Sequence, residues 1–196
     1  PFAMPKIDGQ QFFASMQEFN ASIPWRSLTA SMLILDSHDT ARFRTVVLGD
    51  RNAHLAAMTM LLTYPGAPSI FAGDEIGLEG SWGEDSRRTI NWDDRSGWDV
   101  DFYACVKTLI KLRKESPALI NGGLRWVAVE KDYLAYLRES KDQSLLIFIA
   151  RSAVKAEIDL SKYGYSVAET LYGETANGEK ITIDSKSATE GIWLLK

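Results

Sequence analysis

The chain has 196 residues, which fits one large or two small domains and allows a sizeable buried core. Hydrophobic residues make up 45% of it and charged residues 24%, the proportions of a globular protein rather than a disordered one. The formal net charge of −4 argues against nucleic acid or an acidic membrane surface as a partner.

Cysteine and histidine are scarce. The single cysteine, Cys105, excludes an intrachain disulfide, and with two histidines it also excludes a zinc site of the usual spacing. A lone cysteine favours the cytoplasm over an oxidising compartment. Apolar runs such as 145–150 are far shorter than a membrane span of about 20 residues. The chain opens with Pro1, without a signal-peptide pattern, and we expect its natural start to lie elsewhere.

Helix-length and strand-length segments alternate up to about residue 118. Apolar residues at helical spacing or in long runs predict helices over 10–19, 52–63 and 101–114. Short apolar runs at 32–35 and 69–72 predict strands buried on both faces of a parallel sheet. A long loop rich in Gly, Trp and acidic residues follows the second strand.

After Ser116-Pro117 the pattern contains strands only. The predicted strands are 124–129, 133–138, 145–150, 180–183 and 192–195, separated by turn clusters of Gly, Asn, Asp and Ser. We therefore predict an α/β portion over residues 1–118, followed by an all-β domain over residues 119–196.

The segment Leu33–Phe43 runs from an apolar strand directly into titratable residues. Ligands bind at the carboxyl ends of strands in parallel βα folds, so His38 and Asp39 stand where a site is expected. Taken alone, a His-Asp pair is more often surface or capping decoration. Ser37-His38-Asp39 is also not a catalytic triad, because adjacent residues on an extended chain point to opposite faces.

The segment Gly66–Leu78 predicts a strand followed by a glycine turn. Its glycines match neither a phosphate-binding loop nor the dinucleotide fingerprint. The acidic residues nearby could suggest calcium, but the alternating carboxylates of an EF-hand are absent and solvated loop charges are the preferred interpretation. Those residues are Asp74, Glu75, Glu79, Glu84 and Asp85.

Aromatic and basic side chains of the long loop leave two interpretations open. Trp82, Trp92 and Trp98 could offer apolar faces to sugar rings, but for Trp92 and Trp98 we favour a role in plugging the loop against the fold. Arg87 and Arg88 could bind a hydroxyl-rich or carboxylate ligand, or could pair with the acids just before them.

The order of these motifs resembles the α-amylase family of glycoside hydrolases. The motifs are LDSHDTARF, a helix, GAPSIFAGDEIGLEG, GEDSRRTINW and LIKLRKESPAL, and they look most like the amylase, neopullulanase and cyclomaltodextrinase branch. The resemblance implies an α/β plus all-β fold. It consists of strands 7 and 8 of a (β/α)8 TIM barrel with their helices, as far as about Pro117, and then a C-terminal antiparallel β-sandwich.

The resemblance also implies site residues. Asp39 matches the third catalytic carboxylate of the family, which binds two hydroxyls of the glucose ring at the cleavage point, and His38 matches a hydrogen-bonding partner of the same ring. Arg42 follows in a commonly basic position that we expect to bind substrate. Arg87 falls where the family often has an arginine that contacts a sugar on the non-reducing side. No metal ligand is implied within the chain.

The same resemblance implies that the chain is the C-terminal part of a retaining enzyme. Retaining glycosidases need a nucleophile and an acid about 5–5.5 Å apart, which this family carries on earlier barrel strands. We expect the parent enzyme to hydrolyse α-1,4-glucosidic bonds of starch-like oligosaccharides, and the chain alone to be inactive. Specificity for α-1,6 bonds and transglycosylation stay open. No cofactor is expected, and a structural calcium in the upstream part is left open.

One alternative belongs to a different class: a non-enzymatic carbohydrate-binding or interaction module descended from the amylase fold. An upstream reading frame with nucleophile and acid motifs would discriminate the two. In either case strands 32–35 and 69–71 would leave bare edges without the other barrel strands. We therefore expect association with the missing barrel half or with a second copy of the chain.

Overall fold

The computed structural model describes residues 7–196, so the predicted features of residues 1–6 lie outside it. The helices are α1 (Gly9–Ser22), α2 (Trp25–Ala30), α3 (Phe43–Val46), α4 (Arg51–Thr63), α5 (Val100–Glu115) and α6 (Pro117–Asn121), with short 3-10 turns η1 (Asp74–Ile76), η2 (Gly83–Arg87) and η3 (Leu160–Tyr163). The strands are β1 (Met32–Leu33), β2 (Ala67–Pro68), β3 (Gly123–Val129), β4 (Tyr133–Glu139), β5 (Ser144–Ala150), β6 (Lys155–Asp159), β7 (Val167–Tyr172), β8 (Lys180–Asp184) and β9 (Thr189–Leu195).

Aspartate caps begin the three long helices that the sequence predicts. Asp8 accepts from the Gln11 amide at the start of α1, and Asp50 and Asp99 cap α4 and α5 in the same way. Helices α2, α3 and α6 were not predicted, because they are too short to show a helical period. Across residues 7–196, no helix combines the length and apolarity that crossing a membrane requires.

Strands β1 and β2 form a parallel pair, in which Met32 lies opposite Ala67 and Leu33 opposite Pro68. The predicted strand 69–72 is therefore wrong in position: the paired residues lie just before it. The Ser69 amide still donates to the Leu33 carbonyl at 2.8 Å, after which no further pairing occurs between the two segments. A closed barrel is not seen in residues 7–196, and its seventh and eighth strands stay a prediction.

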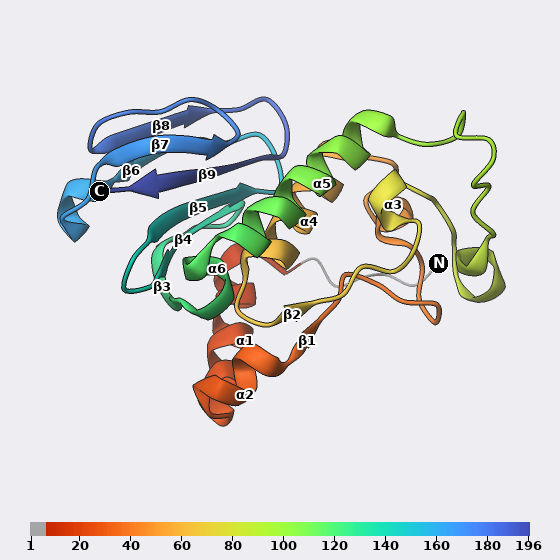
Figure 1. Cartoon of the computed structure of the whole chain (residues 1–196), viewed down its shortest axis with the longest axis horizontal. Coiled ribbons are helices and arrows are strands. Elements are labelled where there is room, and N and C mark those ends of the chain that lie inside the picture. The colour runs from red at the N-terminus through yellow and green to blue at the C-terminus, as the bar shows by residue number, and fades with distance from the viewer. Residues whose placement is uncertain (1–6) are drawn as a thin grey trace.

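The C-terminal part forms an antiparallel five-stranded sheet in the order β3-β4-β5-β9-β7, beside a two-stranded sheet of β6 and β8 (Figure 1). Its β4 and β5 bury both faces, which places hydrophobic side chains in two separate cores. This arrangement is consistent with the predicted β-sandwich. Strands β6 and β7 were missed, and α6 spans the predicted boundary at 118/119, so that division stays a prediction.

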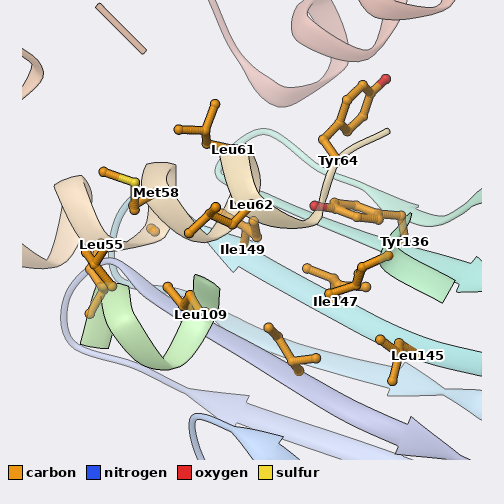
Figure 2. Packing of buried hydrophobic residues seen from close by; sticks show 14 of the residues in the cluster. Leu55, Met58, Leu61, Leu62, Tyr64, Leu109, Tyr136, Leu145, Ile147 and Ile149 are labelled. Carbon is orange, nitrogen blue, oxygen red and sulfur yellow. The ribbon is translucent and has the colours of Figure 1, made fainter. Parts of the chain in front are cut away.

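Helix α4 packs its apolar residues against one face of the five-stranded sheet (Figure 2). Met58 and Leu62 of α4 are fully or almost fully buried, as are Tyr136 of β4 and Ile147 of β5. Leu109 of α5 joins the same cluster (Figure 2). The α/β portion and the large sheet therefore share one hydrophobic core.

Arg138 of β4 fixes the helix ends to this sheet. Its buried guanidinium donates to the carbonyls of Thr63, Leu119, Gly122 and Gly123, with distances of 3.2, 2.9 and 3.1 Å for the last three. Burial lowers the pKa of Arg138 to about 10. One side chain thus satisfies a carbonyl at the end of α4, that of Thr63, and one in the last turn of α6, that of Leu119.

Replacing Arg138 tests this link. Arg138→Met should lower the free energy of unfolding by about 3–5 kcal/mol, because buried carbonyls would lose their donor. The matched control is Arg125→Met on the neighbouring strand. Its half-exposed guanidinium pairs with Glu139, and its loss should cost less than about 1 kcal/mol. Denaturant unfolding measures both, and similar small costs would contradict the role given to Arg138.

Candidate functional site

A tight turn at residues 37–40 carries His38 and Asp39, the two residues that the sequence places at the candidate site. The Ser37 amide donates to Thr40 Oγ1 at 3.0 Å, and the Thr40 amide donates to the Ser37 carbonyl at 3.1 Å. His38 and Asp39 stand at the apex, with side chains 62% and 68% exposed. The expectation that adjacent residues point to opposite faces does not hold here, because the backbone turns and lets the two side chains meet.

Three of the four predicted site residues come together at this turn. Asp39 Oδ1 lies 3.3 Å from His38 Nε2 and 3.1 Å from Arg87 Nη2. Arg87 Nε also donates to the His38 carbonyl at 3.1 Å. Within the part of the chain that the structure describes, no hydrogen bond or ion pair goes to Asp39 Oδ2. The carboxylate is thus oriented on one side and free to accept from a ligand on the other.

A hollow of about 420 Å³ opens beside this cluster. His38, Arg42 and Phe71 line one part of it, and Trp92 and the segment 87–90 line another. A second hollow, of about 480 Å³, lies elsewhere and is lined mainly by apolar side chains of α4, α5 and the segment after β2. The first hollow has the convergent polar groups that a binding site needs, and the second does not.

Arg42, the fourth predicted site residue, is held by bonds within the chain. It is 2% exposed, and its Nε, Nη1 and Nη2 atoms donate to the Ser86 carbonyl, to Asp74 and to the Ala72 carbonyl at 2.8–2.9 Å. The guanidinium also lies over the Phe71 ring, 4.2 Å from its centre. Through these bonds Arg42 joins the loops around the hollow, which it also lines, and its expected role in binding substrate stays a prediction.

The expectation that Trp92 packs the loop against the fold is wrong. Its side chain does not plug the loop against the fold, because it is 62% exposed and lines the hollow beside His38. Trp98 does pack: its ring meets Trp92 edge-on at 5.8 Å and Tyr103 of α5 at 5.7 Å. Trp98 therefore anchors the loop to a helix and supports Trp92 at the edge of the hollow.

The acidic residues of the loop divide into two kinds. Asp85 and Glu84 are surface charges paired with Arg88 at 2.7 Å and Arg87 at 3.7 Å, as one of the open interpretations expected. Asp74 is not a solvated charge: it is 2% exposed and pairs with Arg42. The burial of Asp36 was not predicted from the sequence. Among residues 7–196, no three His, Cys, Asp or Glu side chains cluster in a way that could hold a metal ion.

The second histidine, His54 of α4, is fully buried and cannot reach a ligand. Its Nδ1 accepts from Arg44 Nε at 3.1 Å, and its ring stacks on Phe102 with centres 4.5 Å apart. Arg44 in turn pairs with Asp99 at 3.1 Å, so this network fixes α3 to α5. Burial, with the charge of Arg44, lowers the pKa of His54 to about 3.

The buried histidine predicts a loss of stability in acid. The unfolded chain protonates His54 near its ordinary pKa of about 6.5, whereas the folded chain resists protonation until about pH 3. The contribution of His54 to stability therefore falls as the pH drops through this window. The slope should reach about 1.4 kcal/mol per pH unit. His54→Asn retains an acceptor for Arg44 and should remove this component in urea unfolding at several pH values. His38→Asn, which leaves His54 intact, should retain it, and equal profiles for wild type and His54→Asn would contradict the assignment.

Two families match the sequence in separate regions. The family described as "Alpha amylase, catalytic domain" matches residues 2–96, which include the turn and the hollow. The family described as "Maltogenic Amylase, C-terminal domain" matches residues 124–182, most of the C-terminal sheet.

Individual proteins agree with these matches. A cyclomaltodextrinase from Bacillus sp. is 34% identical over 142 residues, which is 71% of this chain and 25% of that protein. Neopullulanase 2 from Thermoactinomyces vulgaris is 29% identical over 184 residues, 91% of this chain and 31% of that protein. The debranching enzyme of Nostoc punctiforme in its native form superposes with a TM-score of 0.85 at 27% identity, covering 97% of this chain and 41% of that one. The chain thus spans 25% and 31% of the lengths of these two curated relatives.

Proposed function

Because this chain belongs to the α-amylase family of glycoside hydrolases, we propose that it supplies part of the substrate site of a retaining glycosidase. The substrate is an α-glucan oligosaccharide of the starch type, cleaved at α-1,4-glucosidic bonds. The observation that carries the proposal is the cluster of Asp39, His38 and Arg87 at the edge of a hollow. No cofactor enters the proposed chemistry.

Asp39 contributes two carboxyl oxygens that can accept from sugar hydroxyls. One oxygen is already oriented by His38 and Arg87, and two hydroxyls of one ring can donate to the carboxylate. Charge-assisted hydrogen bonds of this kind are stronger than neutral ones. They gain strength as the ring distorts towards the oxocarbenium-like transition state, where positive charge develops beside the carboxylate. Asp39 therefore lowers the barrier more than it improves ground-state binding.

His38 and Arg87 both contact Asp39 and act on two different sugars in this proposal. His38 is largely exposed at the turn apex and offers a ring nitrogen to a sugar hydroxyl. Arg87 is half-exposed, holds Asp39 in place, and has forked donors that can reach the neighbouring sugar on the non-reducing side. Their ion pairs with Asp39 are exposed and therefore weak, so a sugar hydroxyl can take the place of either partner at little cost.

The nucleophile and the general acid come, in this proposal, from earlier barrel strands outside the chain. Parallel strands β1 and β2 would be the seventh and eighth strands of that barrel, with Asp39 at a carboxyl end, where TIM barrels place their sites. Exposed apolar side chains support a missing neighbour: Met32 of β1 is 68% exposed and Ile34 just after it 48%. The rest of the barrel, rather than a second copy, is the partner that this surface fits.

Substituting Asp39 in the longer enzyme tests the assignment. Asp39→Asn should lower kcat by about 10²- to 10³-fold with a much smaller change in KM, because the lost interaction acts mainly in the transition state. His38→Ala should have the same effect in milder form. Asp142→Asn, in an exposed turn of the C-terminal sheet, is the matched control and should leave kcat unchanged. A kcat of Asp39→Asn within a few-fold of wild type would refute the role.

The chain by itself should be inactive. Without the proposed nucleophile and acid, maltooligosaccharides incubated with a preparation free of host amylase should stay intact, as monitored by release of reducing ends. Adding the upstream barrel half should restore hydrolysis. Turnover by the purified chain alone, abolished by Asp39→Asn, would show that the chemistry does not depend on residues elsewhere.

A further inference from the structure

Two buried carboxyl groups face each other beneath the candidate site. Asp36 follows the β1 segment and is 6% exposed, and Asp74 begins η1 after β2 and is 2% exposed. Their side chains are within hydrogen-bonding reach of each other. Arg42 pairs with Asp74 at 2.9 Å, and among the described residues Asp36 forms no ion pair. In the described part of the chain, the buried pair of acids, Asp36 and Asp74, is therefore accompanied by a single buried cation, Arg42.

One oxygen of these two carboxyl groups is buried without a hydrogen-bond donor among the described residues. Asp36 Oδ2 accepts from the Phe43 amide and Asp74 Oδ1 accepts from Arg42, but Asp36 Oδ1 is buried and receives no donor within residues 7–196. A buried acceptor without a donor is costly, and so is a pair of ionised carboxylates in contact. A single proton between Asp74 and Asp36 Oδ1 removes both costs.

We propose that Asp36 and Asp74 share one proton at neutral pH, and that this bond positions the His38–Asp39 turn over the loop after β2. The positioning role rests on the proposed function, whereas the shared proton does not. Asp36 accepts a hydrogen bond from the Phe43 amide. This bond joins the two ends of the segment 36–43, which contains the His38–Asp39 turn. Asp74 is tied through Arg42 to the carbonyls of Ala72 and Ser86, the latter beside Arg87. The pair thus joins the two loops whose residues meet at Asp39.

The charges around the pair agree with this proposal. Burial, and after it the hydrogen bond and charge of Asp36, raise the pKa of Asp74 to about 8, although Arg42 opposes the shift. Arg44 of α3 does not face the pair, since it binds His54 and Asp99. The nearby acid of η1, Glu75, is bound to the backbone instead: its carboxylate accepts from the Gly73 amide at 2.7 Å. Protonation is therefore governed by Asp36, Asp74 and Arg42.

The test compares stability against pH for Asp74→Asn, whose amide can donate as the acid does but cannot titrate. A folded pKa raised from about 3.8 to about 8 gives stability that is full in acid and is lost as the pH rises towards 8. Between about pH 5 and pH 7, the unfolding constant of the wild-type chain should rise about a hundredfold relative to that of Asp74→Asn. Asp36→Asn should flatten the profile in the same way. Asp159→Asn, at the exposed cap of η3, is the control and should keep the wild-type profile.

Parallel profiles for wild type and Asp74→Asn would overturn the shared proton. If the variants fail to fold, ¹³C NMR titration of the wild-type aspartate carboxyls decides the matter directly. The proposal requires a carboxyl that titrates far above the usual range, and it fails if every aspartate is ionised by about pH 5.

A separate readout tests positioning in the longer enzyme. Wild-type kcat should decline as Asp74 ionises above about pH 8, and Asp74→Asn should abolish that alkaline decline, whereas Asp74→Ala should lower kcat at every pH. An unchanged alkaline decline in Asp74→Asn would remove the positioning role. Because the stability measurement uses no substrate, its failure is distinguishable from failure of the proposed glycosidase activity.

Discussion

The buried guanidinium of Arg138 is the contact on which the placement of the other elements depends. It binds the carbonyl ends of α4 and α6 to β4, and the Thr63 hydroxyl at the end of α4 lies 2.6 Å from the Tyr136 hydroxyl on the same strand. Where α4 ends, the chain turns directly into β2. Arg113 of α5 binds the Leu62 carbonyl near that turn at 2.9 Å. The C-terminal sheet thereby sets where β2 runs, and β2 leads to the loop that holds Arg87.

Rigid support and an open site are combined in this molecule. Beneath the turn, Arg42, Asp36 and Asp74 are almost completely buried, Arg42 is paired with Asp74, and Asp36 accepts from the Phe43 amide. Above it, Asp39 and His38 are mostly exposed and held by weak surface pairs. This difference suits a site in which the protein fixes the backbone while the side chains stay free to exchange partners with sugar hydroxyls.

The sequence predicted well those features whose signal is local. The long helices α4 and α5, the strands β4 and β5, and the grouping of His38 and Asp39 at a strand end follow from periodicity and from position along the chain. Features that depend on distant residues were not predictable in this way. The burial of Arg42 and Asp74 arises because residues 32 positions apart meet, and nothing in their immediate neighbours distinguishes them from solvated charges. The exposure of Trp92 likewise depends on how Trp98 packs on α5. A buried acid in each of two adjacent loops was detectable only once the loops were placed side by side.

The central claim is that Asp39 accepts hydrogen bonds from two hydroxyls of the sugar ring at the cleaved bond. A crystal structure of the longer enzyme with an uncleavable maltooligosaccharide analogue tests it most directly. The account predicts both Asp39 oxygens within hydrogen-bonding distance of two hydroxyls of that ring, His38 beside the same ring and Arg87 reaching its neighbour. An analogue bound in the active site with Asp39 still paired to Arg87 and out of reach of any sugar would contradict it.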